Sequence, residues 1–85
     1  MAESNLIAEI TQFVQTIGRI DADSAIHPDQ VLDEELGLDS LAIVEVILKV
    51  EDKYGLTIDE NEASRLRTIR QVADYVAAHQ HSAAA

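Results

Sequence analysis

Ser40 is the side chain whose setting most favours chemistry on a hydroxyl group. Asp39 precedes it and is a good N-cap, so we expect Ser40 in the first turn of a helix with its hydroxyl exposed. Gly37 would allow a tight backbone approach just before this start. Free N–H groups and the positive helix end favour a bound phosphate, so a phosphodiester on the Ser40 oxygen would be well placed. An ordinary first-turn serine has the same local pattern, and Ser40 alone does not decide between the two.

Other candidate sites have simpler interpretations. His79 and His81 have the spacing of a metal-binding pair, but they lie in an expected frayed tail without a third ligand. Adjacent carboxylates diverge in direction along a helix and fit a solvated surface better than acid–base catalysis. Three loop aspartates lack the regular spacing and central glycine of a calcium-binding loop, namely Asp21, Asp23 and Asp29. We therefore predict no metal site and no catalytic residue.

The composition limits the function classes further. The 85 residues make a single domain, residues 1–85, which is too small to enclose a deep catalytic cavity, so we do not expect an enzyme. Cysteine is absent, so any thiol chemistry requires a prosthetic group. The net charge of −10 disfavours nucleic acid and favours basic-faced protein partners. With no window apolar enough to span a bilayer and no basic leader, we expect a cytoplasmic protein.

Hydrophobic periodicity predicts an all-α fold with three longer helices and one short helix, over about residues 4–17, 40–54, 60–66 and 69–79. Ser4 is the expected N-cap of the first helix and Gly18 its C-terminal stop. Residues 19–38 form a long loop that scattered apolar side chains pin to the core, and Pro28 could begin a short helical turn there. Residues 80–85 offer no core side chain and are expected to be a disordered tail.

The two later helices carry their own start signals. Asp59 and Glu62 form a capping-box-like pair for the short helix over 60–66. Thr68 and Gln71 repeat this pattern at the start of the last helix.

The helix over 40–54 carries two apolar stripes. One spans about 100° of the helix and should face the core, and it contains Ile43, Val46, Ile47, Val50 and Tyr54. The second lies well round from the first and is bordered by carboxylates; it contains Leu41, Val44 and Leu48. Such a strip could bind a partner protein, or a neighbouring helix or the loop could cover it, and the residues alone leave both interpretations open.

The string Glu35-Leu36-Gly37-Leu38-Asp39-Ser40-Leu41, followed by an apolar and acidic helix ending at Gly55, resembles the attachment region of acyl carrier proteins. The resemblance covers nearly the whole chain, up to Val76. It implies a four-helix bundle of acyl-carrier type. It also implies a 4′-phosphopantetheine group from coenzyme A on Ser40, flanked by Asp39 and Leu41, which holds acyl intermediates as thioesters.

The resemblance also implies two binding surfaces and a set of partners. Enzymes with basic, apolar-centred docking sites would bind Leu41, Val44, Glu45, Leu48, Glu51 and Asp52. The acyl chain would shelter between the second and third helices, near Val46, Ile47, Val50, Ile58, Ala63 and Leu66. The expected partners are a phosphopantetheinyl transferase, then ketosynthases, acyltransferases and other acyl-processing enzymes of fatty acid or polyketide biosynthesis. We expect a monomer.

Several positions depart from the pattern of primary fatty acid carriers. Ala42 follows the attachment triplet, Lys49 and Lys53 interrupt the acidity of the helix, and basic residues are unusually frequent after Ser64, namely Arg65, Arg67 and Arg70. The sequence is therefore as consistent with a dedicated carrier for a polyketide or another specialised product as with a fatty acid carrier. The alternative from another class is an unmodified acidic adaptor that binds a partner through the second helix. A hydrolase acting through Ser40 has little support, because no histidine is positioned to activate the serine.

Overall fold

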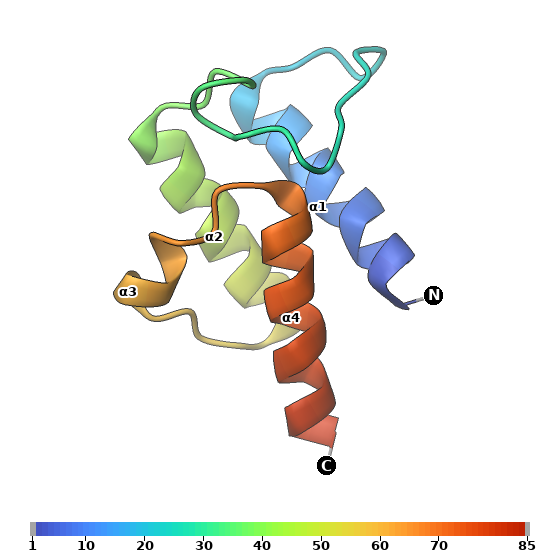
Figure 1. Ribbon diagram of the computed structural model, residues 1–85, viewed down its shortest axis with the longest axis vertical. Coiled ribbons are helices and arrows are strands. Elements are labelled where there is room, and N and C mark those ends of the chain that lie inside the picture. The colour runs from blue at the N-terminus through green and yellow to red at the C-terminus, as the bar shows by residue number, and fades with distance from the viewer. Residues whose placement is uncertain (1, 85) are drawn as a thin grey trace.

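The protein is a bundle of four helices in a computed structural model that describes the backbone of residues 2–84 and the side chains of residues 5–79. The helices are α1 (Ala2–Gly18), α2 (Ser40–Tyr54), α3 (Glu60–Ala63) and α4 (Ile69–Ala84). Figure 1 shows α1, α2 and α4 packed around one core, with α3 as a short turn beside α4 and a long loop across one end. The predicted fold class of three longer helices and one short helix is confirmed.

One contiguous core holds the helices together. Leu6, Ile10 and Val14 of α1 are buried at the spacing of one helix face, and α1 packs against both α4 and α2. The other helices contribute their own buried stripes, namely Val46, Ile47 and Val50 from α2, and Ile69, Val72, Ala73 and Val76 from α4. Aliphatic side chains thus form the whole buried core of the described residues, as expected from a sequence with no tryptophan.

The start of α1 differs from the predicted one, whereas its end at Gly18 is as predicted. The helix begins at Ala2, so Ser4 lies inside the first turn and is not the N-cap. The helix does end at Gly18, but the residue with left-handed backbone is Arg19, with φ 57°. The Ile20 N–H donates to the Gln15 carbonyl at 2.9 Å, which closes a Schellman-type end with Arg19 in the usual glycine position.

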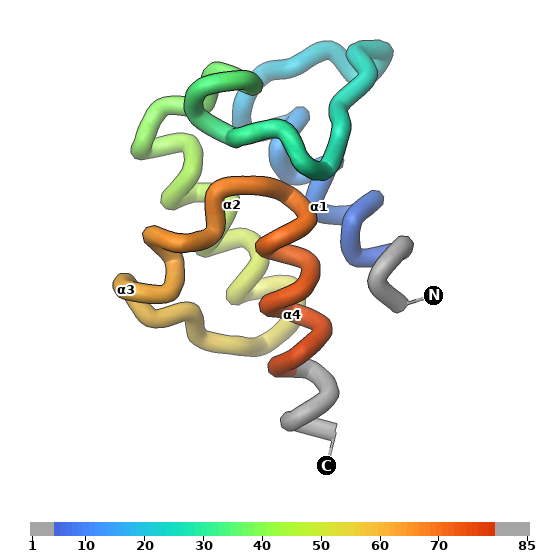
Figure 2. The backbone as a smooth tube through the Cα atoms, viewed as in Figure 1, coloured from blue at the N-terminus to red at the C-terminus, as the bar shows by residue number. Residues whose placement is uncertain are grey.

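The long loop is tied to the start of α4, as Figure 2 shows for the segment around residue 30. The Leu32 N–H donates to the Arg67 carbonyl at 2.8 Å, and the Arg70 N–H donates to the Pro28 carbonyl at 3.0 Å. The turn expected at Pro28 is present as a single turn, in which the Gln30 N–H donates to the His27 carbonyl at 3.0 Å. A second turn follows, in which the Glu35 N–H donates to the Val31 carbonyl at 2.9 Å. Leu32 and Leu38 are buried and anchor the loop to the core, as predicted.

The third helix is shorter than predicted, because α3 ends at Ala63 and residues 64–66 form a turn. The Asp59 side chain makes no capping hydrogen bond, so the predicted capping box with Glu62 is wrong. The last helix has its expected start, since Thr68 Oγ1 accepts the Gln71 N–H at 3.1 Å. In a capping box the Gln71 side chain would accept the Thr68 N–H. It accepts the Arg67 N–H instead, one residue earlier.

The last helix is longer than predicted. It continues through Ala84, where the sequence predicted an end near residue 79 and a disordered tail over 80–85. The high helix propensity of alanine, frequent in this segment, favours this continuation. The side chains of residues 80–85 lie outside the described residues.

Candidate functional site

Ser40 is the first residue of α2, and its side chain is exposed. Asp39 has extended backbone, with φ −79° and ψ 175°, and its Oδ1 accepts the Ala42 N–H at 2.8 Å. This is the N-cap that the sequence predicted. The cap and the following helix fix the direction of the Ser40 side chain, and no hydrogen bond to a described residue holds its hydroxyl. The predicted presentation of this hydroxyl at a helix start is confirmed.

Gly37 has a different role from the predicted one. A Cβ atom at this position would meet nothing within 4 Å, so the glycine does not permit a tight approach. Its φ is +79°, which residues with a side chain rarely adopt, and this conformation lets the chain turn from the loop into α2.

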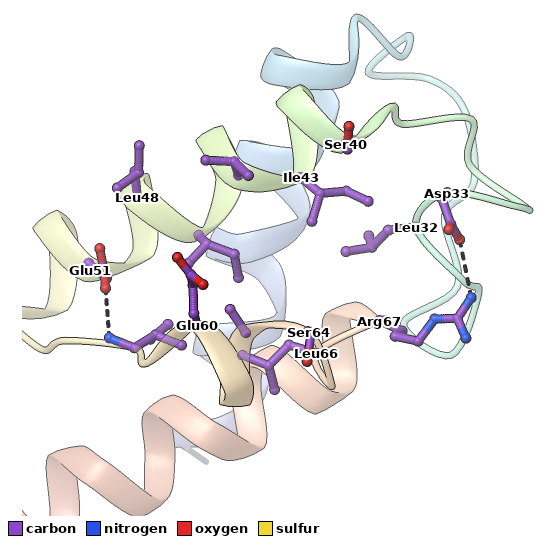
Figure 3. Close-up of a pocket in the computed structure, with 14 residues that line it drawn as sticks. Leu32, Asp33, Ser40, Ile43, Leu48, Glu51, Glu60, Ser64, Leu66 and Arg67 are labelled. Atoms are coloured by element: carbon purple, nitrogen blue, oxygen red, sulfur yellow. Dashed lines mark hydrogen bonds and ion pairs between the residues drawn. The ribbon is translucent and has the colours of Figure 1, made fainter.

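A groove with a volume of about 550 Å³ runs between α2 and the α3 region and begins beside Ser40. Figure 3 shows Ser40 at its rim, with the hydroxyl oxygen directed away from the groove interior. The lining of the groove is mainly apolar. Its apolar side chains are Leu32, Ile43, Val44, Ile47, Leu48, Ile58, Ala63 and Leu66. The groove is therefore suited to an alkyl chain, with polar side chains along its edges.

The predicted acyl-chain residues divide into two groups. Ile47, Ile58, Ala63 and Leu66 line the groove. Val46 and Val50 do not line it, because they face the core and are fully buried. Sequence reasoning missed Leu32 and Ile43, because the helical wheel assigned Ile43 to the core and no local signal places a loop leucine beside α2.

The second apolar stripe of α2 is uncovered. Leu41, Val44 and Leu48 are 66%, 50% and 56% exposed, and they are the large apolar side chains most exposed to solvent among the described residues. This result excludes the interpretation that a neighbouring helix or the loop covers the strip, and partner binding stays a prediction. Glu45 and Asp52 beside it are exposed as well.

Glu51 is partly buried and has an internal role instead. Its Oε2 accepts the Ile58 N–H at 2.6 Å, an interaction drawn in Figure 3, and so fixes the segment that leads from α2 to α3. This bond involves one of its two carboxylate oxygens, and its predicted role in docking stays a prediction.

Two of the three clustered arginines pair with carboxylates of the long loop. Arg67 Nη2 lies 3.5 Å from Asp33 and 3.6 Å from Glu34, and Arg70 Nε donates to Asp29 Oδ1 at 2.6 Å. The hydrogen bond from Arg70 lowers the pKa of the Asp29 carboxyl below its usual value. These unusual residues thus tie the loop to the start of α4, close to the groove that Asp33 and Arg67 also line.

Two tyrosines lie beside glutamates of a neighbouring helix. The Tyr54 hydroxyl of α2 donates to Glu9 of α1, and burial together with this bond raises the tyrosine pKa. The neighbouring Glu62 carboxyl of α3 raises the pKa of Tyr75 on α4 to about 12. Both pairs hold a neutral phenol against a carboxylate.

The sites set aside from the sequence remain without support. Among the described residues, no three histidine, cysteine or carboxylate side chains are grouped so that they could hold a metal ion. His79 stacks on Tyr75 with ring centroids 3.9 Å apart, while the His81 side chain lies outside the described residues. None of the helices described here has both the length and the apolar character needed to cross a bilayer.

The geometry is that of a serine that receives a group rather than one that attacks a substrate. The hydroxyl has no hydrogen-bonded base within the described part of the chain to raise its nucleophilicity. It is open to solvent at a helix start, where an anionic group can be accommodated beside the unpaired N–H groups. The site therefore fits a phosphodiester attached by another enzyme.

Comparison with known proteins gives a consistent result. The family described as "Phosphopantetheine attachment site" matches residues 7–76. An acyl carrier protein of Rubrobacter xylanophilus is 37% identical over 75 residues, which is 85% of this chain and 93% of that protein. The meromycolate extension acyl carrier protein of Mycobacterium tuberculosis is 32% identical over 76 residues, and the matched region is 89% of this chain and 65% of that carrier.

A solved structure gives the same match in three dimensions. It is a candidate acyl carrier protein from Mycobacterium tuberculosis, with a TM-score of 0.77 and 32% sequence identity. The superposition covers 86% of this chain and 96% of the other.

Proposed function

Since the chain belongs to the acyl carrier proteins, the family with a phosphopantetheine attachment site, we propose that the Ser40 hydroxyl is the attachment point. The observation that carries the proposal is the exposed, unbonded hydroxyl at the first residue of α2. The 4′-phosphopantetheine group, when bound, supplies the thiol on which acyl groups are carried as thioesters. The polypeptide has no cysteine, so this thiol cannot come from the chain itself.

The residues around Ser40 prepare the site for a phosphodiester. Asp39 takes up the Ala42 N–H and so fixes the first turn of α2, while the remaining first-turn N–H groups face the attached group. The positive end of the helix dipole stabilises the phosphate charge by about 0.3–1 kcal/mol at an exposed position. Gly37 sets the turn that leaves the hydroxyl accessible to a transferase.

The proposal includes a docking face on α2 for the enzymes that use the carrier. Its centre is the exposed strip of Leu41, Val44 and Leu48, with Glu45 and Asp52 beside it. An apolar centre with carboxylates at its edge suits a shallow, basic-rimmed docking site and short-lived complexes. A phosphopantetheinyl transferase, ketosynthases and acyltransferases are the partner classes, and the chain acts as a cytoplasmic monomer.

The groove beside Ser40 is the proposed shelter for the acyl chain. Its apolar lining from Ile47, Ile58, Ala63 and Leu66 would remove an alkyl chain from water at about 25 cal/mol per Å² of buried area. Leu32 and Ile43 extend this lining toward Ser40.

The proposal is tested by mass. The purified chain is incubated with coenzyme A and a broad-specificity phosphopantetheinyl transferase, and its intact mass is compared with those of Ser40→Ala and Ser64→Ala. Ser64 is the matched control, because it is also exposed and lines the same groove. We expect the native chain and Ser64→Ala to gain one phosphopantetheine and Ser40→Ala to gain none. A native chain that gains no mass beside a known carrier that does would refute the proposal.

A further inference from the structure

Two basic side chains lie on α2, the helix that carries the proposed docking face. Lys49 and Lys53 are both exposed, in a chain whose net charge is −10. On a helix, Lys49 neighbours Glu45 at the i,i+4 spacing and Asp52 at the i,i+3 spacing. Lys53 continues the same row one turn further on. The four exposed side chains therefore form a row of two carboxylates and two ammonium groups, with a formal charge of zero.

The remaining basic residues lie elsewhere. Arg67 and Arg70 pair with carboxylates of the long loop, and Arg19 and Arg65 lie outside α2. Lys49 is held in place, since its Nζ lies 6.0 Å from the centroid of the Phe13 ring on α1. Lys49 and Lys53 are thus the basic residues of the chain that lie on α2.

The two exposed carboxylates of α2 balance the charge of the two lysines and leave no net negative charge in the row. Glu51 accepts the Ile58 N–H and is partly buried, so it adds little to the outer surface. Glu45 and Asp52 are the carboxylates of α2 that remain exposed, and each neighbours Lys49. The flank of the strip that faces α1 is therefore mixed in charge, although the molecule as a whole is strongly acidic.

We propose that Lys49 and Lys53, by cancelling the negative charge of Glu45 and Asp52, determine which acyl-processing enzymes this carrier serves. They fit an enzyme whose docking site has an apolar centre, cations opposite Glu45 and Asp52, and a carboxylate opposite the lysines. They repel a docking site surrounded only by cations, because like charges across an interface disfavour the wrong partner. The inference rests on the proposed function, since it assumes that enzymes dock on α2.

The test uses the chain without its prosthetic group, so its outcome does not depend on modification of Ser40. A β-ketoacyl synthase whose entrance carries lysine and arginine side chains and no carboxylate is immobilised, and association rates are measured by surface plasmon resonance. The double variant Lys49→Gln/Lys53→Gln is compared with Arg19→Gln/Arg65→Gln. Each removes two positive charges and changes the net charge from −10 to −12.

We expect the lysine variant to associate about three- to tenfold faster than the native chain in about 0.05 M salt, with the gain falling below about twofold in about 0.5 M salt. The arginine variant should stay within about twofold of the native rate. Equal gains in both variants, or no gain in the lysine variant, would overturn the inference. Lys53→Gln alone leaves the Lys49 contact with Phe13 intact and should give part of the gain.

A second arm locates the complementary charge. Rim cations of the same synthase are changed to glutamate one at a time, and each variant is assayed with both carriers. For at least one of these glutamate variants of the synthase, the native chain should bind more tightly than it binds the unchanged synthase. The lysine variant of the carrier should bind the same synthase variant more weakly. A synthase series in which the two carriers respond alike at every position would also overturn the inference.

Discussion

At residue 19 the backbone adopts a conformation that a side chain disfavours. Arg19 has φ 57°, which costs a residue with a Cβ atom about 1 kcal/mol relative to glycine. The adjacent Gly18 is needed for a different reason, because a Cβ there would lie 2.9 Å from Leu38 Cδ1. Leu38 is buried and cannot easily move aside. Gly18 is thus required for packing against Leu38, whereas Arg19 adopts the unfavourable left-handed backbone conformation.

This arrangement predicts opposite effects for two neighbouring substitutions. Arg19→Gly should raise the free energy of unfolding by about 0.5–1 kcal/mol, because it relieves the left-handed conformation. Gly18→Ala should lower it by about 1 kcal/mol, because the added methyl group crowds Leu38. Urea unfolding followed by circular dichroism measures both. A loss of stability in Arg19→Gly would show that the arginine side chain itself stabilises the helix end.

On the scale of elements, the C-terminal end of α2 depends on one carboxylate. Gly55 ends the helix with φ 66°, and Glu51 then reaches past this turn to accept the Ile58 N–H. Ile58 is buried and lines the groove, so the bond fixes one groove wall relative to α2. Loss of the acceptor would leave a partly buried N–H group without its partner.

We therefore predict that Glu51 and Asp52 respond differently to substitution. Glu51→Ala should lower the free energy of unfolding by about 1–2 kcal/mol, whereas Glu51→Gln retains an acceptor oxygen and most of the stability. Asp52→Asn should leave stability within about 0.5 kcal/mol and weaken binding to a basic docking site. Urea unfolding and an enzyme-binding assay separate these roles. Equal stability of Glu51→Ala and the native chain would show that the bond to Ile58 contributes nothing.

The elements differ in how far the sequence predicts them, and the reason is the range of the interactions involved. The signals for α2 are local, since Asp39 caps its start and Gly55 ends it, and both predictions are confirmed. The loop turn after Val31 is tied to a distant segment, since the Leu32 N–H donates to the Arg67 carbonyl. The Glu51 bond crosses a turn to a residue seven positions away, and no helix-propensity or capping rule anticipates it.

On the scale of the whole molecule, two tyrosines lie beside carboxylates of a neighbouring helix. Tyr54 of α2 donates to Glu9 of α1, and Tyr75 of α4 neighbours Glu62 of α3. The Tyr75 pKa is about 12 in the folded chain, above its usual value near 10. The folded state therefore holds the phenol proton more tightly than the unfolded state does, and this stabilisation is complete below pH 10 and lost as the pH rises toward 12.

Alkaline titration should therefore weaken the bundle. We expect the free energy of unfolding to fall between about pH 10 and 12, and Tyr75→Phe to reduce that fall, since it removes one of the titrating groups. Urea unfolding at successive pH values measures the change, and absorbance near 295 nm follows phenolate formation. Tyrosines that ionise in the folded chain at their usual pH would contradict these interactions.

The candidate site was predictable in part. The place of Ser40 at a helix start, its cap and the existence of the second apolar stripe follow from residue type and helical spacing, whereas the exposure of that stripe does not. The groove was not predictable in detail, because Leu32 reaches it from the loop and Val46 and Val50 turn away into the core. The pairs of Arg67 and Arg70 with the loop join residues 33 to 41 positions apart, and local sequence patterns do not predict contacts at such separations.

The central claim is that one serine oxygen, that of Ser40, carries the prosthetic group. The most direct measurement is fragmentation of the loaded intact chain in a mass spectrometer, which locates the added phosphopantetheine along the sequence. We predict that every fragment containing Ser40 carries the added mass and that fragments with Ser24 or Ser64 but without Ser40 carry none. Added mass on a fragment that lacks Ser40 would contradict the assignment.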